Sequence, residues 1–222
     1  MNFAGSFLTV TVTIGEMAMD NPHRFWDRLA KRYAKSPVKD EASYQAKLDK
    51  TREFLTPESR VLEIGCGTGS TAIRLAPGVK DYLATDISGN MLEIARDKAE
   101  SIRTLRFEQA MLEQVAMPEG GFDAVLAHSI LHLLPEKEAA VAQIFARLAP
   151  GGVFISSTTC LGKGGVLKGI IWAGSRVGLL PLVRFFDRDA LEEAIKAAGF
   201  EIEYSWQPDP KAAVFLIARK PA

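Results

Sequence analysis

Three glycines and two acidic residues form the pattern in this sequence that most clearly indicates ligand chemistry. A short apolar run leads into Gly65, Gly67 and Gly69, and Glu63 lies inside that run. Glycines at such a place let the backbone approach a ligand closely and adopt dihedral angles that other residues avoid. A second acid, Asp86, ends the next apolar run, about where a nucleotide-binding α/β fold places a carboxylate for ribose hydroxyls. The combination predicts a site for an adenosine-containing ligand.

Two histidines are candidates for proton transfer. His128 follows the apolar run 122–127, where open α/β sheets bind ligands. Its imidazole, with an ordinary pKa of about 6.5, could remove a proton from a nucleophile. Two interpretations stay open: His128 takes part in catalysis or contacts a cofactor, or it is a polar residue that closes the pocket. For His132, one helical turn later, a structural hydrogen bond is favoured. No carboxylate or thiol stands beside this pair at ligand spacing, so we expect no metal site.

Composition limits the class of protein and of partner. The chain has 222 residues, 47% hydrophobic and 24% charged, which predicts one globular domain. Lys and Arg number 27, as do Asp and Glu, so no broad positive field is available for nucleic acid. Cys66 and Cys160 are too few for a disulfide framework, and we expect reduced thiols in a cytoplasmic protein.

The elements that must position these residues alternate along the chain. Apolar runs predict strands at 60–65, 82–86, 105–109, 122–127 and 153–156, with helical patterns between them. Such alternation predicts a parallel sheet covered on both faces. Two further strands, at 200–206 and 213–218, have only a Pro-rich turn between them and should pair antiparallel. The predicted fold is α/β: a Rossmann-like, doubly wound seven-stranded sheet, mostly parallel with an antiparallel C-terminal hairpin strand, plus an N-terminal helical cap.

We expect a single domain over 21–222, with the helical cap at 21–58, after a disordered tail at 1–20. Within the tail, residues 7–14 alternate apolar side chains with Thr, as a strand does. This pattern fits an arm that adds a strand to a partner's sheet. We favour the other interpretation, in which the segment is dispensable and the working protein begins at a translation start near Met17 or Met19. A basic segment and a long apolar run are missing, so we expect no secretory signal.

These motifs resemble those of the class I S-adenosylmethionine-dependent methyltransferases. The residues VLEIGCGTG at 61–69 look like the first motif of that family, ATDIS at 84–88 like its acidic second-strand motif, and LAPGG at 148–152 like the turn before its fifth strand. The likeness runs from about Arg60 to the C-terminus. It implies a class I fold, S-adenosyl-L-methionine as cofactor, and methyl transfer to a small acceptor of apolar character.

Carried over residue by residue, the resemblance implies a cofactor site. The three loop glycines would surround the methionine part, with Glu63 near its amino group. Asp86 would bind the ribose hydroxyls, and Ile87 would pack on the adenine. Where many relatives have an Asp for the adenine amino group, this chain has Met111, so Met111 and Leu112 are expected to contact the base through backbone groups and packing. The candidate cofactor-binding residues are Glu63, Gly65, Cys66, Gly67, Gly69, Asp86, Ile87, Met111, Leu112 and His128.

The segment 160–186 is expected to cover the substrate, as segments at this point of the family commonly do. It mixes glycines with apolar residues, and Lys168, Arg176 and Arg184 interrupt it too often for a transmembrane helix. An apolar and cationic lid suggests a hydrophobic acceptor, which could carry an acid group. An extra layer of core is the second interpretation, and peripheral membrane contact is the third.

Two other functions are kept as alternatives. One is a non-catalytic S-adenosylmethionine-binding or regulatory protein on the same fold. The other, less favoured, is an NAD-dependent oxidoreductase, whose G-x-G-x-x-G fingerprint would place a third small residue at Ser70. Ser70 is small, so the loop alone does not exclude it. Glu63 and the terminal antiparallel pair argue against it.

Overall fold

The computed structural model describes 22–38, 40–99, 101–162, 165–176, 180–181 and 183–222 of the chain. The tail expected at 1–20, with its alternating pattern, lies outside the described residues. Among the described residues, every helix is too short or too polar to traverse a bilayer.

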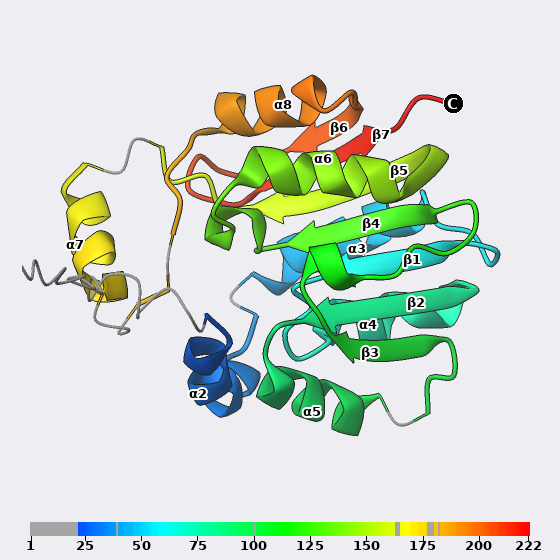
Figure 1. The fold of residues 1–222 in the computed structure, drawn as a ribbon, viewed down its shortest axis with the longest axis horizontal. Helices are drawn as coiled ribbons and strands as arrows, with labels where there is room; N and C mark the ends of the chain where they lie inside the picture. Colours follow the sequence, from blue (N-terminus) through cyan, green and yellow to red (C-terminus); the bar gives the residue numbers. More distant parts are fainter. Residues whose placement is uncertain (1–21, 39, 100, 163–164, 177–179, 182) are drawn as a thin grey trace, which may run out of the picture.

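A seven-stranded sheet forms the centre of the molecule (Figure 1). Its strands are β1 (Arg60–Ile64), β2 (Asp81–Asp86), β3 (Leu105–Gln109), β4 (Phe122–His128), β5 (Leu148–Thr158), β6 (Glu201–Trp206) and β7 (Val214–Arg219). Their order across the sheet is β3-β2-β1-β4-β5-β7-β6. The first five strands pair in parallel, whereas β7 runs antiparallel to both β5 and β6. This confirms the predicted fold class.

The fifth strand is longer than its apolar run predicts. It begins at Leu148, which pairs with Phe122, and the register then shifts before Ala124 pairs with Val153. The turn expected at Pro150–Gly152 is thus an irregularity within the strand. Gly152 tolerates no side chain there, because a Cβ would lie 2.9 Å from the Ala149 carbonyl oxygen.

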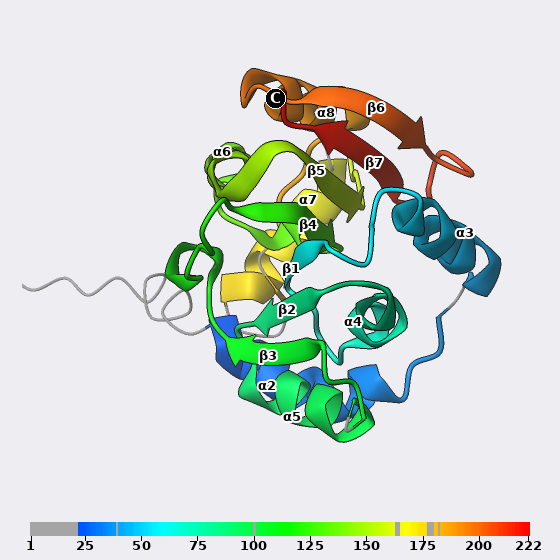
Figure 2. The same cartoon turned by 90° about the vertical axis from the view of Figure 1, so that its right-hand side faces the viewer.

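Helices cover both faces of the sheet (Figure 2). They are α2 (Pro22–Ala34), α3 (Glu41–Arg52), α4 (Ser70–Leu75), α5 (Gly89–Lys98), α6 (Lys137–Arg147), α7 (Gly165–Arg176) and α8 (Arg188–Ala197). Alternate strand residues point to opposite faces. One face packs against α3, α4 and α5 through Leu48, Ala72 and Leu92. The other packs against α6 and α8 through Ile144 and Leu191.

Helix α5 begins where the sequence predicts it. The Ser88 hydroxyl accepts a hydrogen bond from Met91 N at 3.2 Å, which satisfies a backbone donor of the first turn. The same hydroxyl donates to the Asp27 carboxylate at 2.6 Å, and Asn90 N also donates to that carboxylate. Helix α2 is therefore attached to the start of α5, beside the end of β2.

Candidate functional site

The candidate residues meet at the carboxyl edge of the parallel strands. Asp86 ends β2, the loop 65–69 follows β1, and His128 ends β4. These three strands are neighbours in the sheet, and parallel strands end at the same edge, which is where open α/β sheets bind ligands. Helices α2 and α7 lie at this edge as well (Figure 1).

The loop after β1 adopts backbone angles that favour glycine. Gly65, Gly67 and Gly69 have φ of 66°, 55° and 75°, a region that costs other residues about 1–2 kcal/mol. The Asp86 carboxylate accepts a hydrogen bond from Gly67 N at 2.9 Å and another from Ser88 N at 2.8 Å. Asp86 thereby fixes the loop. Burial raises its pKa, although these two hydrogen bonds oppose the shift.

The glycines differ in what surrounds them. A Cβ on Gly65 would lie 2.8 Å from Ile130 Cδ1, and one on Gly69 would lie 3.1 Å from Phe107 Cζ. Both positions are needed for packing inside the protein. A Cβ on Gly67 would have Tyr33 Cε1 as its nearest neighbour, at 3.7 Å. Gly67 is therefore the glycine whose free side faces the site.

Glu63 lies beneath this loop in a buried position. Its carboxyl accepts a hydrogen bond from the Tyr82 hydroxyl at 2.8 Å. Burial, with the negative charge of Asp86 adding to it, raises the pKa of Glu63 to about 8. The carboxyl is thus mostly protonated at neutral pH, and a cation placed next to it would favour the charged form.

Two tyrosines of the N-terminal helices also belong to the site, and the sequence reasoning missed their role. Tyr33, from α2, is exposed and lies over Gly67. Tyr44, from α3, shares a hydrogen bond of 3.2 Å with the Thr71 hydroxyl of α4. In the sequence both fall at helical spacing among apolar residues, so the hydrophobic pattern gives them no functional signal. The polar end of an aromatic side chain beside a candidate loop is the signal that could have found them.

His128 ends β4 in a largely apolar setting beside β5 and β7. Its ring lies edge-on to Phe215, with centroids 6.4 Å apart. Burial, with the positive charge of Lys47 adding to it, lowers the pKa of His128 to about 4, so the imidazole is neutral at pH 7. Its Nε2 is buried and has no hydrogen-bond partner among the described residues. Ser129, which follows, has a φ of 56°, a strained angle for a residue other than glycine.

Lys47 is a further site residue that the sequence reasoning did not identify. From α3 its ammonium donates to the Ser157 hydroxyl at 2.9 Å. Ser157 is the residue of β5 that pairs with His128. A single lysine within a helical pattern carries no signal of this contact, which joins residues 110 positions apart.

His132 is fixed through its backbone. Its carbonyl accepts from Arg184 N at 2.7 Å, which attaches the expected lid segment to the residues after β4. Burial lowers the pKa of His132, and its Nδ1 has no partner in the part of the chain that the structure describes.

The region expected to hold an adenine lies at the ends of β2 and β3. Gln109 donates to the Ile87 carbonyl at 3.0 Å and so shapes the loop after β2. Met111 N donates to the Gln114 side chain at 2.9 Å, while the Met111 side chain is exposed. Leu112 is buried in the core. Met111 can therefore offer its side chain to a ligand, but its N–H is already used.

The cysteines show no sign of reactivity. Burial raises the pKa of the Cys66 thiol well above its usual value and that of Cys160 to about 11. A reactive thiol needs the opposite shift. Metal-ligating side chains do not gather in groups of three or more within the described ranges.

Helix α7 lies within the segment 160–186 and borders a hollow of about 330 Å³. The start of α6 and residues 183–186 complete its walls, which include Lys137, Lys168 and Arg184. The side chain of Arg176, one of the three cations that interrupt this segment, lies outside the part of the chain that the structure describes.

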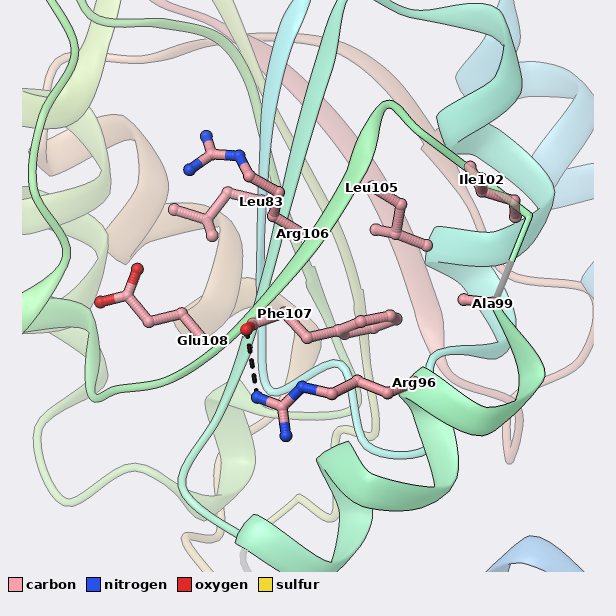
Figure 3. Close-up of a pocket in the computed structure, with 8 residues that line it drawn as sticks. All are labelled: Leu83, Arg96, Ala99, Ile102, Leu105, Arg106, Phe107 and Glu108. Carbon is pink, nitrogen blue, oxygen red and sulfur yellow. Dashed lines mark hydrogen bonds between the residues drawn. The ribbon is translucent and has the colours of Figure 1, made fainter.

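A second hollow, of about 520 Å³, lies along the edge strand β3 (Figure 3). Arg96 of α5 extends across it and donates to the Phe107 carbonyl at 3.2 Å. Strand β3 is separated from β4 by β2 and β1. This hollow is therefore remote from His128 and brings no candidate catalytic group together.

Known proteins are similar to part of this sequence and to its fold. A family model described as a methyltransferase domain matches residues 61–152. An uncharacterized methyltransferase of Bacillus subtilis, YcgJ, is 30% identical over 100 residues, which cover 44% of this chain and 40% of that protein. The chain spans less than half the length of the curated relatives it matches.

Solved structures share the fold at low identity. An S-adenosylmethionine-dependent methyltransferase of Mesorhizobium loti has a TM-score of 0.62 and 19% identity, over 79% of this chain and 98% of that one. The [4+2]-cyclase SpnF has a TM-score of 0.68 and 20% identity, over 85% of each chain. Residues 61–152 thus match a methyltransferase domain, and the fold is similar to that of S-adenosylmethionine-dependent methyltransferases.

Proposed function

We propose that this protein transfers the methyl group of S-adenosylmethionine to a small, apolar acceptor bound over the carboxyl ends of β4 and β5. The observation that carries the proposal is the Asp86 carboxylate, which holds the glycine loop through Gly67 N at 2.9 Å. Each carboxylate oxygen has more than one lone pair. The group can therefore bind the loop and still accept from ribose hydroxyls.

The residues around Asp86 fit the remaining parts of the cofactor. The free side of Gly67, where a Cβ would lie 3.7 Å from Tyr33 Cε1, faces the proposed place of the methionine part, with the Tyr33 ring beside it. The protonated carboxyl of Glu63 can ionise next to an amino group. The exposed Met111 side chain can pack on the adenine. The N–H of Met111 already donates to the Gln114 side chain. We therefore assign the N–H of Leu112 as the donor of the hydrogen bond to the adenine.

Methyl transfer needs positioning more than it needs a catalytic group. When bound, the cofactor would supply a methyl group on an activated sulfonium, so that an acceptor nucleophile could bond to the methyl carbon in line while the C–S bond breaks and S-adenosylhomocysteine leaves. Holding the two reactants in the right geometry contributes about 7–11 kcal/mol in favourable cases. The protein supplies this through the loop, Asp86 and the N-terminal helices. The neutral imidazole of His128, whose Nε2 has no hydrogen-bond partner among the residues that the structure describes, can accept a proton if the acceptor begins protonated.

We further propose that 160–186 is a lid over the acceptor and that 21–58 caps the cofactor. The lid proposal is supported by the hydrogen bond that Arg184 N donates to the carbonyl of His132. His132 lies four residues after His128. The cap proposal is supported by the contact of Asp27 with Ser88 and by Tyr33 over Gly67.

The test combines binding and turnover. Calorimetry should show that the purified protein binds S-adenosylmethionine. Incubation with a metabolite extract should then produce S-adenosylhomocysteine, and mass spectrometry should find a metabolite heavier by one methyl group. Binding without S-adenosylhomocysteine would support a binding protein or another activity on this fold. The [4+2]-cyclase SpnF, which shares this fold, is an example of another activity on it.

A further inference from the structure

Helix α3 brings a cation to the end of β5. The Lys47 ammonium donates to the Ser157 hydroxyl at 2.9 Å, and Ser157 is buried beside His128, its pairing partner on β4. Lys47 itself is partly buried. These three polar side chains form a group on the face of the sheet that α3 covers, next to the ring of Phe215.

The positive charge of Lys47 is not balanced by the side chains around it. An ammonium has three donors, and Ser157 takes one of them. Ser157 is neutral, and so is His128. Across the described residues, no carboxylate lies within 4.0 Å of Lys47 Nζ. Asp40 attracts Lys47 from a distance, but Asp40 is exposed and accepts from Ser43 N at the start of α3.

Lys50, one turn further along α3, provides the contrast. Its ammonium pairs with Glu53 at 2.7 Å and lies 4.8 Å from the centre of the Tyr204 ring. That lysine is satisfied within the protein. A partly buried ammonium without a counter-ion is costly, and Lys47 lies at the edge of the sheet where ligands bind. This arrangement is expected where a ligand supplies the negative charge.

The position of Lys47 favours the acceptor over the cofactor as the source of that charge. The sheet order places Asp86 on β2 and Ser157 on β5, with β1 and β4 between them. Neighbouring strands lie about 4.8 Å apart, so roughly 14 Å separate the proposed ribose site from the strand that Lys47 reaches. The cofactor is proposed to lie over β2 and β1, which leaves β4 and β5 for the acceptor.

We propose that Lys47 binds a carboxylate on the methyl acceptor and so selects an apolar acid. The proposal rests on the proposed function for the place of the acceptor. The neutral, partly exposed His128 ring, which packs on the buried Phe215 ring, lies beside the ammonium, and the cation and this ring together fit a molecule with a carboxylate at one end and an apolar body.

The experiment compares carboxylates with the matching amides. Octanoate, benzoate, octanamide and benzamide are titrated calorimetrically into the full chain, both with S-adenosylhomocysteine bound and without it. At least one acid should bind at least tenfold more tightly than its amide. Lys47→Met should abolish this preference, Lys47→Arg should retain it because the cation remains, and the matched control Lys50→Met should leave it unchanged.

Each other outcome overturns the proposal. Equal binding of acid and amide, or an acid preference that survives in Lys47→Met, would show that Lys47 holds no acceptor carboxylate. If Lys47→Met instead weakens S-adenosylmethionine binding tenfold and spares the acids, the ammonium holds the carboxylate of the cofactor. Failure of the unmodified protein to bind S-adenosylhomocysteine contradicts the proposed function, and the titrations without cofactor then still decide the role of Lys47.

Discussion

The Asp86 carboxylate accepts a hydrogen bond from the backbone N–H of Gly67 at 2.9 Å, which joins the end of β2 to the loop after β1. Its other oxygen accepts from Ser88 N, at the start of α5. One side chain therefore fixes the two backbone segments between which a ribose would lie. The side chain proposed to bind the cofactor also shapes the site before the cofactor arrives.

Replacing Asp86 should weaken cofactor binding strongly. Asp86→Ala removes the proposed bonds to the ribose hydroxyls, each worth about 1.5–3 kcal/mol, and it also releases Gly67 N–H. We expect the Kd for S-adenosylmethionine, measured by calorimetry, to rise at least about tenfold. Asp81→Ala, at the other end of β2 and paired with exposed Arg106, is the matched control. An unchanged Kd in Asp86→Ala would contradict this placement.

Two glycine substitutions should separate packing from ligand binding. Gly65→Ala combines a positive φ with a Cβ 2.8 Å from Ile130 Cδ1, so we expect the free energy of unfolding to fall by about 2–4 kcal/mol. Gly67→Ala has the positive φ, but its Cβ would make only an ordinary van der Waals contact with Tyr33 at 3.7 Å, so its cost should be about 1–2 kcal/mol. Urea unfolding measures both values.

The effect of the two substitutions on cofactor affinity should not follow their effect on stability. In Gly67→Ala the new methyl group occupies the free side of the loop, so we expect weaker binding of S-adenosylmethionine than its small loss of stability explains. The double variant Gly65→Ala/Ile130→Ala should recover part of the stability lost in Gly65→Ala, since it removes the overlap. Equal stability of the two single variants would count against the different roles assigned to these glycines.

Much of this site could be predicted from the sequence because its signals are local. The glycine loop, Asp86 and the Ser88 cap each depend on residues within a few positions of one another, and the alternation of strands and helices fixes which strand ends meet. The last two strands were also predictable, because a short turn forces an antiparallel pair. The family model matches the same segment, 61–152.

The contacts that complete the site could not be predicted in this way. Asp27 meets Ser88 across 61 positions, and Lys47 meets Ser157 across 110. These polar contacts depend on how α2 and α3 pack against the sheet, which the hydrophobic pattern of each helix does not specify. The early start of β5 was missed for a related reason, because pairing with Phe122 overrides the Pro-Gly-Gly signal.

His128 should make the protein less stable in mild acid. Its pKa in the folded state, about 4, lies below the unfolded value of about 6.5. Between these two values the imidazole of His128 is mostly protonated in the unfolded chain and mostly neutral in the folded chain. The free energy of unfolding therefore falls as the pH drops from about 6.5 to about 4. The contribution is at most about 3 kcal/mol. His128→Gln should flatten this part of the profile of unfolding free energy against pH. A profile with the same slope in the variant would exclude His128 as its cause.

The lid proposal can be tested on α7. Ile171 is partly buried and borders the hollow beside Arg184. Ile171→Ala should raise the KM for the acceptor and leave the Kd for S-adenosylmethionine unchanged. Ala173→Ser, at an exposed position of the same helix, is the control. If α7 is core instead, Ile171→Ala should cost about 2–5 kcal/mol of stability and damage both functions together.

Cofactor binding should release a proton from Glu63. Burial and Asp86 raise its pKa to about 8, so the ligand-free protein holds a proton there at pH 7. If the amino group of S-adenosylmethionine lies next to this carboxyl, its positive charge lowers the pKa and expels the proton. Calorimetry at pH 7 in buffers of different ionisation enthalpy should therefore report release of up to about one proton per site. Glu63→Gln keeps an acceptor for the Tyr82 hydroxyl but has no proton to lose, so its binding enthalpy should be the same in every buffer. Proton release that persists in Glu63→Gln would place the amino group elsewhere in the site.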